Sequence, residues 1–156
     1  MILAAHELSC PKLLITSGWQ SYSETRQEAW DRSVWMVGEL CRFAEKYGVS
    51  LTMETLSRQS TTLVNTISDL KQMMKEVNSK AFTITADIHT IYNAKESIQD
   101  YFDTFGKKLN HCHFMDYKNG IRSHLAWGDG EADIKEILDI FDRNRFSGHF
   151  VFGIYR

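Results

Sequence analysis

The sequence predicts an α/β fold in which parallel strands alternate with helices that pack outside them. Two observations predict it: five short apolar, β-branched runs recur along the chain, and a segment with apolar residues three or four apart lies between each pair. An open doubly wound sheet and a (β/α)8 barrel both fit. No Gly-x-Gly-x-x-Gly turn follows a strand, which removes the main support for a nucleotide-binding open sheet. A full barrel takes about 250 residues and this chain has 156, so periodicity alone leaves both architectures open.

The first half of the chain is expected to form strand, helix, strand and helix. KLLITSG (12–18) is a short apolar run closed by glycine, as in a buried strand. The helix that begins at Glu24 ends near Tyr47 and Gly48. VSLTME (49–54) is the second strand, and a polar loop separates it from the second helix. The apolar positions that define the two helices are Trp30, Val34, Val37, Leu40, Cys41 and Ala44, then Ile67, Leu70, Met73, Met74 and Val77.

The second half repeats this order. AFTITAD (81–87) is a third strand, rich in β-branched and aromatic residues, and Gly106 ends the helix that follows it. LNHCHFMD (109–116) is the fourth strand. After a glycine-bearing loop, Asp133 is a good N-cap for the last helix, and GHFVFGI (148–154) is the last strand. The apolar positions of these two helices are Ile98, Tyr101, Phe102 and Phe105, then Ile134, Ile137, Leu138 and Phe141.

Composition limits the classes of function. With 43% hydrophobic and 24% charged residues the chain is typical of one globular domain, and no apolar run approaches the roughly 20 residues that a membrane span needs. No basic leader precedes an apolar block, so we expect a cytoplasmic protein without a membrane partner. A net charge of −2 without a basic stripe disfavours nucleic acid as a partner. The three cysteines are widely spaced and are expected to be buried thiols.

Metal-competent side chains end three of the expected strands, where parallel α/β folds place their chemistry. These are Glu54, Asp87 and His113. Singly, each carboxylate also fits a helix cap or a solvated loop residue, but the three together favour coordination. Two carboxylates and an imidazole suit Mn²⁺, Mg²⁺, Co²⁺ or Zn²⁺. His111 lies two positions before His113 and therefore faces the same side of the strand.

Three segments resemble the sugar phosphate isomerase/epimerase family, which has the xylose isomerase-like barrel. METLSRQSTTLVNT (53–66) is similar to the Glu-Pro-Leu-Asn-Arg…Asn-Leu-Val-Asn-Thr segment after that family's fifth strand. ADIHTIY (86–92) resembles its sixth strand end, and YFDTFGKKLNHCHFMD with GDGEADIKEIL resembles its seventh unit. The resemblance implies a partial (β/α)8 barrel over residues 1–156, with about five parallel strands, the family's fourth to eighth, and outer helices. The first three strands would then be missing.

The resemblance also implies roles for individual residues. It places the metal ligands on Glu54, Asp87 and His113, with Glu54 also acting in catalysis, and leaves His111 in the barrel interior. The cofactor implied is a divalent metal (Mn, Mg, Co or Zn).

Three further residues are expected to bind the substrate, a small sugar or sugar phosphate. His89 follows Asp87 by two residues, whereas many family members place a substrate-binding histidine three residues after that aspartate. His124 and Trp127 lie in the loop before GDGE and are expected to line the pocket.

Two positions depart from the family pattern. The family's substrate-contacting glutamate falls on Ser60, which carries no charge, and the fourth ligand, a glutamate on the eighth strand, falls on Gly153. In the family two glutamates exchange a proton with the carbon next to a carbonyl, through a cis-enediolate. Glu54 is one of that pair, but Gly153 neither binds metal nor transfers a proton. We therefore expect weak metal binding.

The sequence leaves three candidate functions for this chain. The first is a metal-dependent sugar or sugar-phosphate isomerase or epimerase, impaired in this truncated chain. The second is a non-catalytic remnant that oligomerises and binds metal or sugar without turnover. The third is an endonuclease IV-like phosphodiesterase, which needs more histidines and carboxylates and a surface that attracts DNA; the charge of −2 disfavours it.

Assembly follows from the strand count. Five strands cut from a barrel have two bare edges and an exposed inner surface. Leu14, Leu51, Ile84 and Phe150 are expected to face the missing strands, and exposing such side chains costs about 1.5 to 3 kcal/mol each. We therefore expect a homo-oligomer, in the form of a two-fold dimer.

Overall fold

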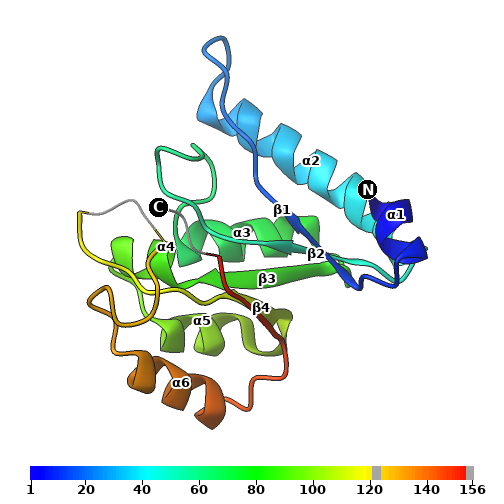
Figure 1. The fold of residues 1–156 in the computed structure, drawn as a ribbon. Helices are drawn as coiled ribbons and strands as arrows, with labels where there is room; N and C mark the ends of the chain where they lie inside the picture. Colours follow the sequence, from blue (N-terminus) through cyan, green and yellow to red (C-terminus); the bar gives the residue numbers. More distant parts are fainter. Residues whose placement is uncertain (121–123, 154–156) are drawn as a thin grey trace.

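The five strands of this computed structural model form one parallel sheet that curls into a partial barrel with helices on its outer side (Figure 1). The structure describes residues 1–120 and 124–153. The strand order is β1-β2-β3-β4-β5, and every neighbouring pair is parallel. The elements are α1 (Ile2–Glu7), β1 (Lys12–Ile15), α2 (Arg26–Glu45), β2 (Ser50–Met53), α3 (Ile67–Val77), β3 (Phe82–Asp87), α4 (Ile88–Asn93), α5 (Ile98–Phe105), the 3-10 turn η1 (Gly106–Lys108), β4 (Leu109–His113), α6 (Ile134–Arg143) and β5 (His149–Val151).

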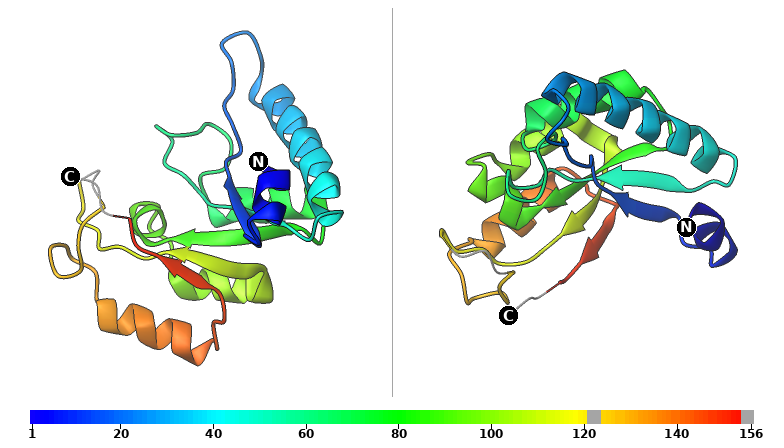
Figure 2. Two further views of the ribbon diagram at one scale, coloured as in Figure 1. Left: turned by 45° about the vertical axis from the view of Figure 1, so that its right-hand side comes forward. Right: turned by 90° about the horizontal axis from the view of Figure 1, so that it is seen from above.

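The strand order decides between the two architectures. A doubly wound sheet reverses its order at a switch point, whereas each strand here lies beside its sequence neighbour. The view from above in Figure 2 shows the sheet curling from β1 to β5, with the helices outside. The expected partial (β/α)8 barrel is confirmed.

Alternate residues of the strands meet different surroundings, as the pleat requires. Leu51 and Ile84 lie in the apolar core, 1% and 0% exposed. Thr52 and Thr85 lie on the other, concave side of the sheet, where their buried hydroxyl oxygens are 2.7 Å apart. The concave face is polar over β2, β3 and β4, with Leu14 and Val151 as apolar residues at its two borders.

The expectation that Leu51, Ile84 and Phe150 face missing strands is therefore wrong. Leu51 and Ile84 lie in the core on the helix side. Phe150 is in register with the core residue Cys112, and its ring centroid lies 4.9 Å from that of Phe141 on α6.

The element boundaries follow local capping. Thr25 forms a capping box with Glu28, so α2 begins two residues later than expected. Asp133 accepts a hydrogen bond from the Glu136 N–H at 2.9 Å, which confirms it as the N-cap of α6. The strands β1 and β5 are shorter than the sequence predicts, and residue 154 of the expected last strand lies outside the described residues.

Two short helices, α1 and α4, were not expected from periodicity because each has only six residues. Cys41 and Cys112 are buried as expected, but Cys10 is exposed, so that expectation is wrong for Cys10. Among the described residues, none of the helices combines the length and the apolar character that crossing a membrane requires.

Apolar side chains remain exposed at both borders of the sheet. Leu14 on β1 is 46% exposed, and Phe150 on β5 is 47% exposed. On the outer side, Met36, Leu40 and Phe43 form a partly exposed stripe along α2. An uncovered strand edge offers unpaired backbone groups to a neighbouring chain.

We propose that the chain self-associates through these borders as a two-fold dimer. Light scattering on a dilute sample should give twice the mass of the 18.1 kDa chain. The substitution Phe150→Asp should shift the chain toward monomer, because it places a charge on the exposed β5 edge. Tyr22→Ser is the matched control, since Tyr22 is a fully exposed aromatic residue outside the sheet. A cooperatively unfolding monomer of the unaltered chain would contradict the prediction.

Candidate metal centre

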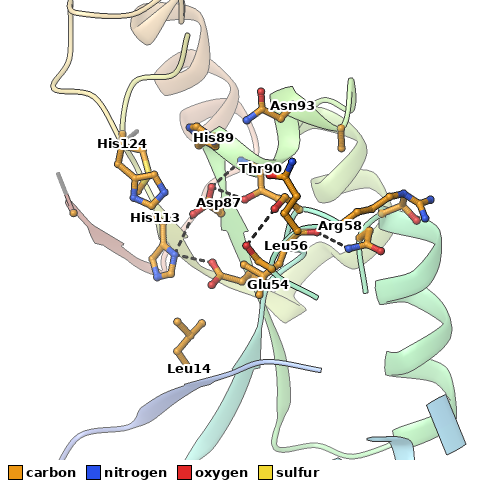
Figure 3. A pocket seen from close by; sticks show the side chains of 18 of the residues that line it. Leu14, Glu54, Leu56, Arg58, Asp87, His89, Thr90, Asn93, His113 and His124 are labelled. Carbon is orange, nitrogen blue, oxygen red and sulfur yellow. Dashed lines mark hydrogen bonds and ion pairs between the residues drawn. The ribbon is translucent and has the colours of Figure 1, made fainter. Parts of the chain in front are cut away.

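Glu54, Asp87 and His113 come together at the carboxyl ends of β2, β3 and β4 (Figure 3). Because these strands are adjacent and parallel, residues that end them lie at one edge of the sheet. One ligand atom from each residue lies within 4.8 Å of the other two. His113 Nδ1 is 2.8 Å from Glu54 Oε2 and 3.4 Å from Asp87 Oδ2. The three side chains thus direct their donor atoms at one another.

The two carboxylates are buried and have different partners. Asp87 uses Oδ1 to cap α4, accepting hydrogen bonds from the Thr90 N–H at 2.8 Å and the Thr90 hydroxyl at 2.9 Å. Its Oδ2 is left to face His113. Within the part of the chain that the structure describes, the buried Glu54 Oε2 accepts no well-aligned hydrogen bond. Two carboxylate oxygens and one ring nitrogen therefore converge, a donor set that fits a divalent cation.

The pKa values show how tightly the three groups are coupled. Burial raises the pKa of Glu54, and His113 only partly opposes that rise. Burial also acts to raise the pKa of Asp87, but hydrogen bonds from His113 and Thr90 outweigh it and the pKa is lowered. For His113, burial acts to lower the pKa, but the two carboxylates outweigh it and raise the pKa to about 10. Without a metal, the imidazolium supplies the positive charge between the carboxylates.

A cavity of about 1010 Å³ opens over these residues. Leu14 of β1 and Val151 of β5 line it from the two borders of the sheet, and Figure 3 shows Leu14 on the side of the cluster opposite to His89. The loop after β2 contributes Arg58 and Ser60. The uncharged polar lining also includes Ser57, Gln59, Asn65, Thr66, Thr90 and Asn93.

Of the three expected substrate-binding residues, two line the cavity. The rings of His89 and His124 face each other with their centroids 5.4 Å apart. Trp127 lies elsewhere: its indole N–H donates to the Phe114 carbonyl at 3.3 Å, and its ring packs against Phe152. The structure therefore brings His89 and His124, but not Trp127, to the metal cluster.

His111 lies on β4 beside His113, and Gly153 follows the end of β5. His111 is partly buried, and its ring lies edge-on to His113 with the centroids 5.3 Å apart. Burial, helped by the neighbouring His113, lowers the pKa of His111 to about 4. Gly153 lines the cavity after β5 and supplies no side chain.

Sequence reasoning missed Lys12 and Asp116. Lys12 reaches from β1 across the concave face, where its ammonium donates to the Asn110 carbonyl at 2.6 Å and lies 3.0 Å from His149 Nδ1. Asp116 is a buried carboxylate just beyond β4. Its sequence signal is the glycine-rich GDG at 128–130, which its carboxylate contacts.

Comparison with known proteins defines the class. The family model for the xylose isomerase-like TIM barrel matches residues 1–156, and the chain belongs to this family. Among curated relatives, fructoselysine 3-epimerase from Escherichia coli O157:H7 is 29% identical over 140 residues, covering 89% of this chain and 51% of the relative. The chain thus spans about half the length of that relative.

Solved structures share the fold at low identity. The 3-keto-D-glucoside 4-epimerase of E. coli superposes with a TM-score of 0.85 at 15% identity, over 98% of this chain and 60% of that protein. The IOLI protein, whose structure is described as having a binding zinc atom, superposes with a TM-score of 0.82 at 19% identity, over 100% of this chain and 58% of that protein. At these identities the likeness shows the fold alone.

Metal binding at pH 7 should release about one proton, because a ligand nitrogen must lose its proton and the pKa of His113 is raised to about 10. In the metal-free protein the raised pKa stabilises the fold below pH 6.5, and this contribution is lost as the pH rises through 10. Calorimetry in two buffers of different ionisation enthalpy measures the release. Equal apparent binding enthalpies in both buffers would contradict the ion pairing of His113.

Proposed function

We propose that this chain is a divalent-metal-dependent sugar or sugar-phosphate isomerase or epimerase that binds Mn²⁺, Mg²⁺, Co²⁺ or Zn²⁺ through Glu54, Asp87 and His113. The observation that carries the proposal is the convergence of these donors, from three neighbouring strand ends, at a polar cavity. Family membership and the epimerase relatives support it, and the zinc atom of the IOLI structure supports the choice of a metal.

A bound divalent cation would polarise a sugar carbonyl and neutralise developing negative charge. Glu54 would take a proton from the carbon next to that carbonyl, because its carboxylate lies in the cavity beside the other two ligands. His89 and His124 would donate or accept hydrogen bonds with sugar hydroxyl groups. Arg58 lies at the cavity on an exposed loop and would attract a phosphate or another anionic group.

Gly153 favours a second candidate, a chain that binds metal or sugar without turnover. Epimerisation needs a group that returns a proton on the opposite face of the reacting carbon. Among the described residues at the end of β5, Val151 and Gly153 line the cavity, and neither carries a group that can transfer a proton.

Titration of Mn²⁺ or Zn²⁺ into metal-free protein, combined with an assay of fructoselysine epimerisation, tests the proposal. His113→Ala should weaken metal binding by at least about 100-fold, more than the loss of an outer hydrogen-bond partner costs. His111→Ala is the matched control, with the same substitution on the same strand face. It should keep the metal affinity and lower the stability by about 1 kcal/mol.

The outcomes separate the two candidates. Metal binding with epimer formation supports the enzyme. Metal binding without epimer formation supports the non-catalytic chain. If His113→Ala binds metal as well as the parent does, the ligand assignment is wrong and both candidates lose their basis.

A further inference from the structure

Asp116 lies three residues beyond the ligand His113 and takes no part in the metal cluster. Asp116 is buried, with 1% of the residue exposed. Oδ1 accepts hydrogen bonds from the N–H groups of Tyr117 at 2.8 Å and Ala132 at 3.0 Å, and Oδ2 accepts from Gly128 at 2.9 Å and Gly130 at 3.1 Å. One side chain therefore ties the start of the 117–132 segment to its end.

The backbone of Asp116 adds a second tie. Its N–H donates to the Leu125 carbonyl at 3.0 Å, and the Leu125 N–H donates back to the Asp116 carbonyl at 3.2 Å, as an isolated antiparallel bridge. The Glu131 N–H donates to the Tyr117 carbonyl at 2.7 Å. Because Leu125 directly follows His124, the bridge fixes the backbone from which His124 reaches the cavity.

The packing around the carboxylate leaves room only for glycine at residue 130. A Cβ atom added to Gly130 would lie 2.3 Å from Asp116 Oδ1 and 2.3 Å from the Tyr117 carbonyl oxygen. Burial acts to raise the pKa of Asp116, but the backbone N–H groups outweigh it and lower the pKa, so the ionised carboxylate accepts these bonds. The glycine at residue 130 and the hydrogen bonds to the Asp116 carboxylate therefore belong to one packed arrangement.

We propose that Asp116 is a positioning residue, which holds the described parts of the loop, residues 117–120 and 124–132, so that His124 stands opposite His89 beside the metal cluster. Figure 3 shows both histidines on one side of Asp87 and His113. The consequence for sugar binding rests on the proposed function. The positioning itself depends only on the contacts of Asp116.

The ring centroids of His89 and His124 lie 5.4 Å apart. The test is to measure the nuclear Overhauser effect between these two rings in histidine-labelled protein. Asp116→Asn should abolish it, because an amide nitrogen would replace one of the two accepting oxygens and face N–H donors. Asp129→Asn is the matched control, since Asp129 is exposed in the same loop, and it should keep the contact. Persistence of the contact in Asp116→Asn, or its equal loss in the control, would overturn the proposal.

Two measurements keep the proposal falsifiable if Asp116→Asn does not fold. Gly130→Ala displaces the carboxylate without removing its charge, and should also abolish the contact. In the unaltered protein, the amide protons of Gly128, Gly130 and Ala132 should be protected from hydrogen exchange at neutral pH, because the carboxylate accepts their hydrogen bonds. Exchange of these amides at the rate of an unfolded chain would overturn the proposal.

A ligand readout separates this inference from the proposed function. Asp116→Asn should keep the Mn²⁺ affinity of the parent, because Asp116 is no ligand. It should weaken fructoselysine binding by about 10-fold, the effect of losing about one hydrogen bond from a misplaced His124. Unaltered protein that binds neither Mn²⁺ nor fructoselysine would overturn the proposed function. The ring contact and the amide protection would still decide the role of Asp116.

Discussion

The site depends on the charge balance among Glu54, Asp87 and His113. Two carboxylates that are 7% and 3% exposed have lost most of their hydration, and side by side they repel each other. A positive charge between them compensates both costs, whether His113 carries it as an imidazolium or a cation takes its place. The raised pKa of His113, the lowered pKa of Asp87 and the raised pKa of Glu54 all follow from this contest between burial and attraction. Burial and charge attraction oppose each other here because the parallel pairing of β2, β3 and β4 brings the ends of these strands together.

The two faces of the curled sheet differ in composition. The side under the helices is apolar and supplies the core, while the concave side carries threonines, histidines and Lys12. Lys12 spans from β1 to β4 and β5, and so links the two borders of the sheet on the concave side. The borders themselves remain open, with Leu14 and Phe150 each about half exposed. The chain thus has a formed set of ligands inside a barrel wall that covers only part of the circumference.

The sequence predicted what depends on local pattern. The proximity of Glu54, Asp87 and His113 could be predicted from their positions at strand ends. Parallel strand order brings neighbouring strand ends together whether or not the sheet curls. The predicted orientation of the Leu51 and Ile84 side chains was wrong, because an apolar run does not show which alternate residues lie under a helix. The role of Asp116 was missed because its partners lie up to sixteen residues along the chain, in a loop whose path no periodicity predicts. Trp127 was misplaced for the same reason.

Diffraction at the zinc absorption edge, from crystals of this chain grown with Zn²⁺, tests the central claim most directly. The account predicts an anomalous peak bonded to His113 Nδ1 and to one oxygen each of Glu54 and Asp87, at about 2.0 to 2.2 Å. A zinc ion bound elsewhere, with His113 still paired to both carboxylates, would contradict it.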